Sequence, residues 1–229
     1  MSSERLPKKV LLPLGDKNVL SRVIERVKLC PLVDEIVIAT TTQPADEAIV
    51  EVAVKNGVSH FRGDLHDVLS RYYGAAIASH ADTIVRITSD CPLFDPYLLE
   101  EMLKVFRQRT GQLDYLSNVI KRTYPRGLDS EIFTFAALKR TFEEAKVPYD
   151  REHVTLYIRQ HTELFRTEDY VGPEDFSHHR WTLDTPEDYQ FLTAIYDNVK
   201  PVTTAAVIDF LKRHPEVMQL NAHVEQKKT

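Results

Sequence analysis

The sequence has few of the residues that build several common functional sites. Only two of its 229 residues are cysteines, Cys30 and Cys91, and they stand in no metal-ligand spacing. This excludes a disulfide framework and a zinc site of the ribbon type, and it favours a reducing compartment. The seven glycines form neither a Walker loop nor a dinucleotide-binding fingerprint. A P-loop enzyme and a Rossmann oxidoreductase are therefore disfavoured.

Long apolar runs and an excess of positive charge are also missing. No apolar stretch is long enough to span a bilayer, and the polar start of the chain has no signal-peptide core. The net charge of -5 argues against a general nucleic-acid binder. What remains is a composition with 43% hydrophobic and 28% charged residues, enough for one large domain. We expect a single cytoplasmic domain over residues 1–229, without membrane insertion.

Strand and helix patterns alternate along the chain. Strands are predicted at 35–40, 58–61, 83–87, 115–119, 132–135, 163–170 and 178–183, and helices at 18–27, 47–56, 67–79, 96–105, 137–145 and 151–160. This order predicts a three-layer α/β/α, Rossmann-like fold with a mixed, mainly parallel sheet. Within it, we assign residues 118–171 to a flap or dimerisation extension.

One aspartate stands where open α/β sheets place their ligands. The strand predicted at 83–87 stops just before Asp90, and Asp95 and Pro96 then offer the N-cap and first turn of a helix. In such sheets, ligands bind beyond the carboxyl ends of the strands. Asp90 is therefore a candidate metal ligand.

A second aspartate repeats this arrangement. Asp184 follows the strand predicted at 178–183, and Thr185 and Asp188 form a capping-box-like pair at the start of the next helix. Two carboxylates suffice for Mg²⁺, because waters and phosphate oxygens supply its other ligands. Asp90 and Asp184 are therefore a candidate Mg²⁺ site. The alternative is that both only cap nearby turns.

Several segments together resemble one enzyme family. In the opening loop, the residues that match the family's loop in the same order are Met1, Ser3, Arg5, Leu6, Pro7, Lys9, Val10 and Leu11. The later blocks that resemble the family read EIVIATTTQPADEAI, FRGDLHDVLSRYYGAA, VRITSDCPLFDP, YPRGLDSEIF, REHVTLYI and TLDTPEDY. From Met1 to about Phe191 the chain resembles the cytidylyltransferases that activate acidic sugars. It is most similar to the family of spore coat polysaccharide biosynthesis protein F, which is related to CMP-sialate and CMP-KDO synthetases. The resemblance implies the nucleotide-diphospho-sugar transferase fold.

The resemblance also implies a reaction. CMP would pass from CTP to an acidic sugar, giving a CMP-sugar and pyrophosphate for surface polysaccharide biosynthesis, in an enzyme of a kind that is usually a homodimer. Such a transfer depends on charge neutralisation and positioning. Arg5, Lys9 and Asp90 are the implied catalytic residues. Arg5 and Lys9 would hold the triphosphate, and Asp90 and Asp184 would bind Mg²⁺.

The substrate contacts follow from the same blocks. The implied nucleotide contacts are Ser3, Arg5, Lys9, Ala39, Thr40, Thr41, Arg62, Asp67 and Arg71. For Arg71, the alternative is an ion pair with Asp67 on one helix face. The implied sugar contacts are Arg126, Asp129, Glu131 and His153, with Arg126 facing the sugar carboxylate. For His153, the alternative is a structural role.

The chain departs from the family pattern at its start. The family's loop follows a first strand ending in Gln-Ala-Arg, and this sequence begins after that point, while Lys8 and Ser89 stand where the family has glycine. We therefore expect an open position in the middle of the sheet and one arginine fewer at the phosphates. Two alternatives follow: a non-catalytic, dimeric nucleotide- or sugar-binding relative, and a uridylyl- or guanylyltransferase with the same fold.

Overall fold

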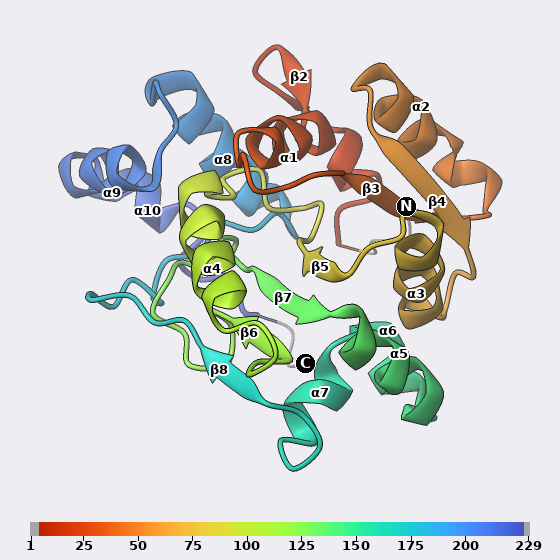
Figure 1. Ribbon diagram of the computed structural model, residues 1–229. Coiled ribbons are helices and arrows are strands. Elements are labelled where there is room, and N and C mark those ends of the chain that lie inside the picture. Colours follow the sequence, from red (N-terminus) through yellow and green to blue (C-terminus); the bar gives the residue numbers. More distant parts are fainter. Residues whose placement is uncertain (1–4, 227–229) are drawn as a thin grey trace.

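Helices surround a set of short strands in the computed structural model, which describes residues 5–226 (Figure 1). The helices are α1 (Val19–Lys28), α2 (Glu47–Lys55), α3 (Val68–Ala78), α4 (Pro96–Gln108), α5 (Phe135–Glu144), α6 (Pro148–His153), α7 (Leu156–Gln160), α8 (Pro186–Asn198), α9 (Thr204–Arg213) and α10 (Pro215–Gln219), with 3-10 turns η1 (Lys9–Leu11) and η2 (Pro44–Asp46). Over the described residues, none of these helices has the length and apolar character needed to cross a membrane.

The strands form a mixed arrangement. They are β1 (Pro13–Leu14), β2 (Lys17–Asn18), β3 (Val37–Thr41), β4 (Ser59–Gly63), β5 (Thr83–Arg86), β6 (Tyr115–Ser117), β7 (Glu131–Thr134) and β8 (Thr167–Asp169). β1 and β2 form an antiparallel hairpin, β3 and β4 a parallel pair, and the remaining strands a sheet in the order β5-β7-β6-β8. In that sheet β7 is antiparallel to β5 and β6, and β8 is parallel to β6. The predicted mixed sheet is confirmed, but a parallel majority is not found among the described pairings.

The two larger sheets are separated by an open groove. β3 and β5 are not hydrogen-bonded to each other, and a cavity of about 730 Å³ lies between them. Its walls include Ile24 of α1, Tyr72 of α3, Val37 of β3 and Val85 of β5. Among the described strands, β3 pairs only with β4 and β5 only with β7, and the open central position implied by the resemblance stays a prediction.

Alternating side chains of the four-stranded sheet build two cores. Leu116 and Ile132 are register partners and pack with α1 and α4. Their neighbours Tyr115 and Phe133 are also partners, but they pack with α3 and α5. Successive side chains of a strand point to opposite faces, so this segregation places helices on both faces of the sheet. This is the predicted three-layer α/β/α arrangement.

Local sequence signals place the helices that flank the site. Asn18 accepts a hydrogen bond from the Ser21 amide at the start of α1, and Asp95 caps α4 through the amides of Tyr97 and Leu98. Thr185 and Asp188 complete a capping box at the start of α8. These caps satisfy amides that have no partner within the helix. The helix starts predicted after Asn18, Asp95 and Thr185 are therefore confirmed.

Three predictions differ from the structure. The single helix expected at 151–160 is two helices, because Val154 has φ of 58° and breaks the backbone between α6 and α7. The strand expected at 178–183 is an irregular extended segment with one bridge, between Arg126 and Arg180. β7 lies inside the 118–171 segment but between β5 and β6, so that part belongs to the sheet. A dimerisation role for the rest of the segment, a homodimer and a cytoplasmic location stay predictions.

Candidate functional site

Backbone contacts bring the two predicted metal aspartates together. Asp90 follows β5, and its carbonyl accepts a hydrogen bond from the Leu183 amide at 2.9 Å. This contact places the next residue, Asp184, beside Asp90, although 94 positions separate the two in the chain. The capping box of α8 fixes the backbone on the other side of Asp184. The two carboxylates therefore share one site at the carboxyl end of β5.

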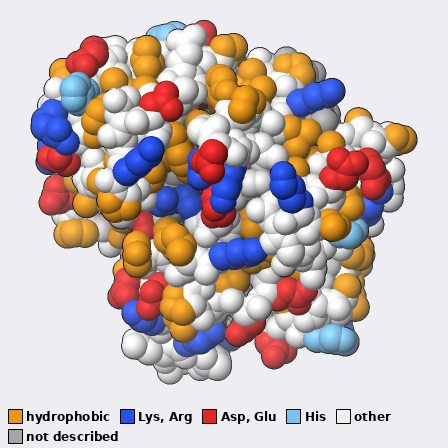
Figure 2. Space-filling view, turned by 90° about the horizontal axis from the view of Figure 1, so that it is seen from above, with side chains coloured by type: hydrophobic (Ala, Val, Ile, Leu, Met, Phe, Trp, Pro, Cys, Tyr) orange, Lys and Arg blue, Asp and Glu red, His pale blue; other side chains and the backbone are white. Residues whose placement is uncertain are grey.

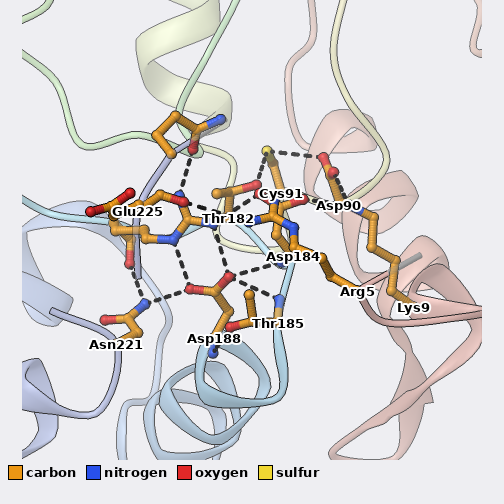
Figure 3. A network of polar contacts seen from close by, with 12 residues as sticks. Arg5, Lys9, Asp90, Cys91, Thr182, Asp184, Thr185, Asp188, Asn221 and Glu225 are labelled. Atoms are coloured by element: carbon orange, nitrogen blue, oxygen red, sulfur yellow. Dashed lines mark hydrogen bonds and ion pairs between the residues drawn. The ribbon is translucent and has the colours of Figure 1, made fainter. Parts of the chain in front are cut away.

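A lysine already bridges these carboxylates. The Nζ atom of Lys9 lies 2.6 Å from Oδ2 of Asp90 and 2.7 Å from Oδ1 of Asp184 (Figure 3). Arg5 adds an ion pair to Asp184 at 3.2 Å. The predicted catalytic residues Arg5, Lys9 and Asp90 thus meet in one network with Asp184. Their roles in a reaction stay predictions.

Arg180 holds Asp184 from the other side. Its Nη2 atom lies 2.8 Å from Oδ2 of Asp184, and its Nε lies 2.9 Å from Oδ1 of Asp188. Asp188 is completely buried and also accepts a hydrogen bond from Asn221 at 2.9 Å. Because Asp188 is fixed by the α8 capping box, Arg180 is oriented by the fold. The orientation of Asp184 is therefore set before any ligand arrives.

The close contacts shift proton affinities in opposite directions. Burial alone would lower the pKa of Lys9, but the charges of Asp90 and Asp184 outweigh it and raise that pKa. Burial would raise the pKa of Asp184, but hydrogen bonds and charges from Lys9 and Arg180 lower it. Lys9 is therefore protonated and Asp184 ionised at neutral pH.

The aspartate pair fits a divalent cation. Its two carboxylate oxygens, from segments far apart in the chain, are close enough to share the single ammonium of Lys9. Oxygen donors of this kind suit Mg²⁺, which keeps waters and phosphate oxygens as its other ligands. Among residues 5–226 there is no cluster of three or more His, Cys, Asp or Glu side chains that could hold a metal without such help. A cation here would need a phosphate ligand and would compete with Lys9.

The predicted base-contacting residues lie at the end of β3. Ala39 lines the groove that also reaches Asp90, so one cavity connects the two. Thr40 and Thr41 are buried, and both hydroxyls donate to the Asp46 carboxylate. Of the three predicted base contacts, only Ala39 lines this groove, and contacts of Thr40 and Thr41 with a base stay predictions. The predicted contact at Ser3 lies outside the described residues.

The other predicted nucleotide contacts have protein partners. Arg62 pairs with Glu47 at 2.6 Å. Asp67 caps α3 and pairs with Arg151 at 2.6 Å, while Arg71 donates to backbone carbonyls before that helix. The alternative ion pair between Asp67 and Arg71 is therefore not formed. These contacts give all three residues a structural role, and a direct nucleotide contact stays a prediction.

The predicted sugar contacts fall into two groups. Asp129 is held by Arg122 through two hydrogen bonds, of 2.6 and 2.9 Å, and the Arg126 guanidinium lies near enough to Asp129 and Asp184 to feel both charges. Glu131 is only 3% exposed and His153 packs edge-on against Tyr149. Arg126 and Asp129 thus border the aspartate site, whereas the contacts of Glu131 and His153 are structural.

Glu131 provides a prediction about stability. It forms an ion pair with Arg86 and accepts hydrogen bonds from Tyr115 and Thr155. We expect Glu131→Gln to lower the free energy of unfolding by about 3–5 kcal/mol, because it leaves the partly buried Arg86 charge without its carboxylate partner. Urea denaturation at pH 7 measures this loss. A change below about 1 kcal/mol, equal to that of the exposed Glu143→Gln control, would contradict it.

The same carboxylate predicts a pH dependence. Burial would raise the pKa of Glu131, but Arg86 and the two hydroxyl donors lower it below its ordinary value of 4.5. A lowered folded-state pKa contributes stability above the unfolded-state pKa and loses it as pH falls through the folded value. We therefore expect part of the acid-induced loss of stability below pH 4.5 to be absent in Glu131→Gln.

The positive charge of the site is local. On the face shown in Figure 2, Lys and Arg side chains are intermixed with Asp and Glu. The same holds inside the site, where Lys9, Arg5 and Arg180 all contact aspartates. A ligand with several phosphates could attract these cations away from the carboxylates they now neutralise.

Sequence reasoning missed two parts of the site. The sequence pattern places Arg180 only within a predicted strand, although its position four residues before Asp184 permits the ion pair that the structure shows. The segment from Asn221 to Gln226 crosses the site: the Glu225 carbonyl lies 3.5 Å from Arg5, and the Gln226 side chain lies 2.5 Å from Arg180. No motif marks this segment, so only the folded structure reveals it.

Comparisons with known proteins agree with this geometry. The cytidylyltransferase family model matches residues 1–229. An uncharacterised protein of Methanocaldococcus jannaschii is 38% identical over 233 residues, covering 98% of this chain and 92% of the relative. Spore coat polysaccharide biosynthesis protein SpsF of Bacillus subtilis is 34% identical over 227 residues, covering 94% and 92%. A 3-deoxy-manno-octulosonate cytidylyltransferase of Koribacter versatilis is 26% identical over 157 residues, covering 67% and 58%.

Solved structures lead to the same family. A cytidylyltransferase from Leptospira borgpetersenii superposes with a TM-score of 0.93 at 36% identity, covering 100% of this chain and 95% of that one. The predicted Rossmann-like nucleotidyltransferase fold and the predicted family are confirmed. The chain belongs to the cytidylyltransferase family.

Proposed function

We propose that this protein transfers CMP from CTP to the hydroxyl of an acidic sugar. The observation that carries the proposal is the shared position of Asp90 and Asp184, bridged by a lysine that a triphosphate can attract. Relatives support the substrate classes: one is named for spore coat polysaccharide biosynthesis and another as a 3-deoxy-manno-octulosonate cytidylyltransferase. The product would be a CMP-sugar for surface polysaccharide biosynthesis.

The chain's own residues would position and neutralise the triphosphate. Lys9 and Arg5 leave the aspartates and donate to phosphate oxygens, while Arg180 keeps Asp184 in place. The sugar hydroxyl oxygen forms a bond to the α-phosphorus, and the bond from that phosphorus to the bridging oxygen breaks. Pyrophosphate leaves with the electron pair, and the hydroxyl proton passes to solvent.

Asp90 and Asp184 would hold Mg²⁺, which when bound supplies charge neutralisation to the phosphate oxygens. Because both carboxylates already have cationic partners, the protein offers few free ligand positions before nucleotide binds. Cation and nucleotide are therefore expected to bind together.

A thermal-shift experiment tests nucleotide binding. At about 100 times its dissociation constant, CTP with Mg²⁺ stabilises the folded state by about 2.7 kcal/mol. For a chain of this size we expect a rise in Tm of roughly 5–10 °C. CTP in excess EDTA is the control, and no rise with CTP and Mg²⁺ would refute the proposal. A larger rise in Tm with UTP or GTP than with CTP would instead support the alternative of a uridylyl- or guanylyltransferase.

Release of pyrophosphate separates an enzyme from a binding protein. We expect release only when CTP, Mg²⁺ and a sugar acid are all present, because the acceptor hydroxyl is the attacking group. CTP-dependent stabilisation without release from any tested sugar acid would instead support the non-catalytic relative.

A further inference from the structure

The chain beyond α10 returns to the aspartate site and contacts two of its cations (Figure 3). The side-chain oxygen of Gln226 accepts a hydrogen bond from Nη1 of Arg180 at 2.5 Å. The backbone carbonyl of Glu225 accepts a longer one, of 3.5 Å, from Nη1 of Arg5. We call residues 222–226 the C-terminal strap. The strap thus uses hydrogen-bond donors that face the proposed position of the phosphates.

The strap is anchored at its first end, by Asn221. This residue is only 3% exposed, and its Nδ2 atom donates to the Arg180 carbonyl at 3.0 Å and to Asp188 at 2.9 Å. Four of the five strap residues that follow are exposed. Within the described part of the chain, their backbone-to-backbone hydrogen bonding is limited to one bond, from the Val224 amide to the Asn221 carbonyl. Asn221 is therefore a fixed point from which the strap can move.

The strap is not tightly packed on the residues beneath it. A cavity of about 210 Å³ lies between the C-terminal segment and the extended segment from Ser177 to Trp181. Val224 lines this cavity and is only half-buried. Side chains next to unfilled space lose van der Waals contacts, and segments with few packed contacts open most easily. The strap is therefore a part of the site that can move at low cost.

Arg180 could change partners on one side without losing those on the other. Its Nε and Nη2 atoms donate to Asp188 and Asp184, whereas Nη1 donates to Gln226. Release of Gln226 would free Nη1 and leave intact the contacts that orient Asp184. Arg180 could then hold Asp184 and donate to a phosphate oxygen at the same time.

The acceptors on the strap are weaker than phosphate oxygens. The Gln226 amide oxygen and the Glu225 carbonyl are neutral, whereas phosphate oxygens are anionic and can accept two parallel hydrogen bonds from one guanidinium. Glu225 also brings a carboxylate to the strap, and its charge repels phosphates. A polyphosphate should therefore displace the strap, and the strap should oppose its binding.

We propose that the C-terminal strap is an autoinhibitory contact, which occupies Arg5 and Arg180 in the free protein and is displaced when a polyphosphate binds. This proposal rests on the proposed nucleotide site and adds to it a competitor that belongs to the chain itself. A ligand that binds only the strap-open form has its apparent affinity reduced by the fraction of molecules in that form. The strap therefore sets how much nucleotide the protein needs.

Two substitutions of Gln226 should change the affinity for CTP in opposite directions. Gln226→Leu removes the acceptor for Arg180, so we expect CTP with Mg²⁺ to bind about threefold more tightly. Gln226→Glu gives Arg180 a charged acceptor, so we expect CTP to bind about tenfold more weakly. Calorimetric titration measures both. Gln219→Leu and Gln219→Glu, at an exposed position of α10, are the matched controls and should leave the affinity unchanged.

A spin label on the strap reports its displacement directly. His223→Cys offers an exposed thiol, whereas the natural cysteines Cys30 and Cys91 are buried, so a nitroxide reagent labels the strap selectively. We expect the electron paramagnetic resonance spectrum to show a more mobile label after addition of CTP or inorganic tripolyphosphate with Mg²⁺. Gln226→Leu should give the mobile spectrum without any ligand, and a label on Gln219→Cys should not respond.

The outcomes separate the strap from the proposed function. Equal CTP affinity in Gln226→Leu, Gln226→Glu and the unchanged protein would overturn the strap proposal and leave the nucleotide site standing. Weaker binding by Gln226→Leu would do the same, because the strap would then assist the ligand. Tripolyphosphate that mobilises the label where CTP does not would support the strap and refute the CTP site. Binding of neither ligand by any of these proteins would refute both.

Discussion

Replacing Asp90 by asparagine is expected to reduce CMP transfer by about a thousandfold. A carboxylate that helps hold a catalytic cation contributes several kcal/mol to transition-state stabilisation, and about 1.4 kcal/mol corresponds to each factor of ten. Asn keeps the shape of the side chain but carries no charge, and Asp90 and Asp184 are the two carboxylates, now bridged by Lys9, at which we propose that the cation binds. Pyrophosphate release with saturating CTP and Mg²⁺ measures the loss.

The fold should survive this change. The hydrogen bond that holds the Leu183 segment beside the turn after β5 is accepted by the Asp90 backbone carbonyl, which asparagine retains. The side chain itself contacts Lys9 and, at 3.6 Å, the Cys91 thiol, so we expect stability to change by less than about 1 kcal/mol. Asp209→Asn, on the exposed surface of α9, is the matched control. Activity within tenfold of the control would show that Asp90 is not part of the reaction site.

Lys9→Met is expected to move two affinities in opposite directions. In the free protein the Lys9 ammonium occupies the position between Asp90 and Asp184, so its removal frees both carboxylates for a divalent cation. The same substitution deletes a charged donor to the triphosphate, which is worth about 1.5–3 kcal/mol. We expect Mn²⁺ alone to bind at least tenfold more tightly and CTP to bind about ten- to a hundredfold more weakly.

Lys8→Met separates this effect from a general loss of charge. Lys8 is adjacent in sequence but exposed, and it has φ of 59°, at the position where the family pattern has glycine. Titration with Mn²⁺, followed by electron paramagnetic resonance, reports the metal affinity of both variants without any reaction. If Lys9→Met binds Mn²⁺ no more tightly than Lys8→Met does, Lys9 does not compete for the cation position.

Elements with strong local signals could be predicted from the sequence. Asn18, Asp95 and Thr185 stand directly before apolar helical patterns, and each caps the helix predicted there. The break at Val154 could not be predicted, because no glycine or proline marks it. The extended segment before Asp184 alternates like a strand, but its pairing depends on a single distant partner, Arg126.

The candidate site could be predicted only in part, because many of its contacts join residues that are far apart in the sequence. Asp90 and Asp184 can be predicted, because an aspartate that follows a strand-like pattern is visible in the sequence. Whether a charged side chain is available to a ligand depends on whether other side chains already pair with it. Such partners can lie far along the chain, and the sequence does not reveal them. Asp67 is held by Arg151, 84 residues away, and Glu131 by Arg86 and two hydroxyls. Arg180 and the segment after Asn221 enter the site through such long-range contacts.

The central claim is that Asp90 and Asp184 form a cation-dependent CTP site. Calorimetric titration of CTP into the protein, with Mg²⁺ and with EDTA, tests it most directly, and Asp90→Asn is titrated in parallel. We expect CTP to bind at least a hundredfold more tightly with Mg²⁺ than with EDTA, and this gain to disappear in Asp90→Asn. CTP binding of equal affinity in all of these titrations would contradict the claim.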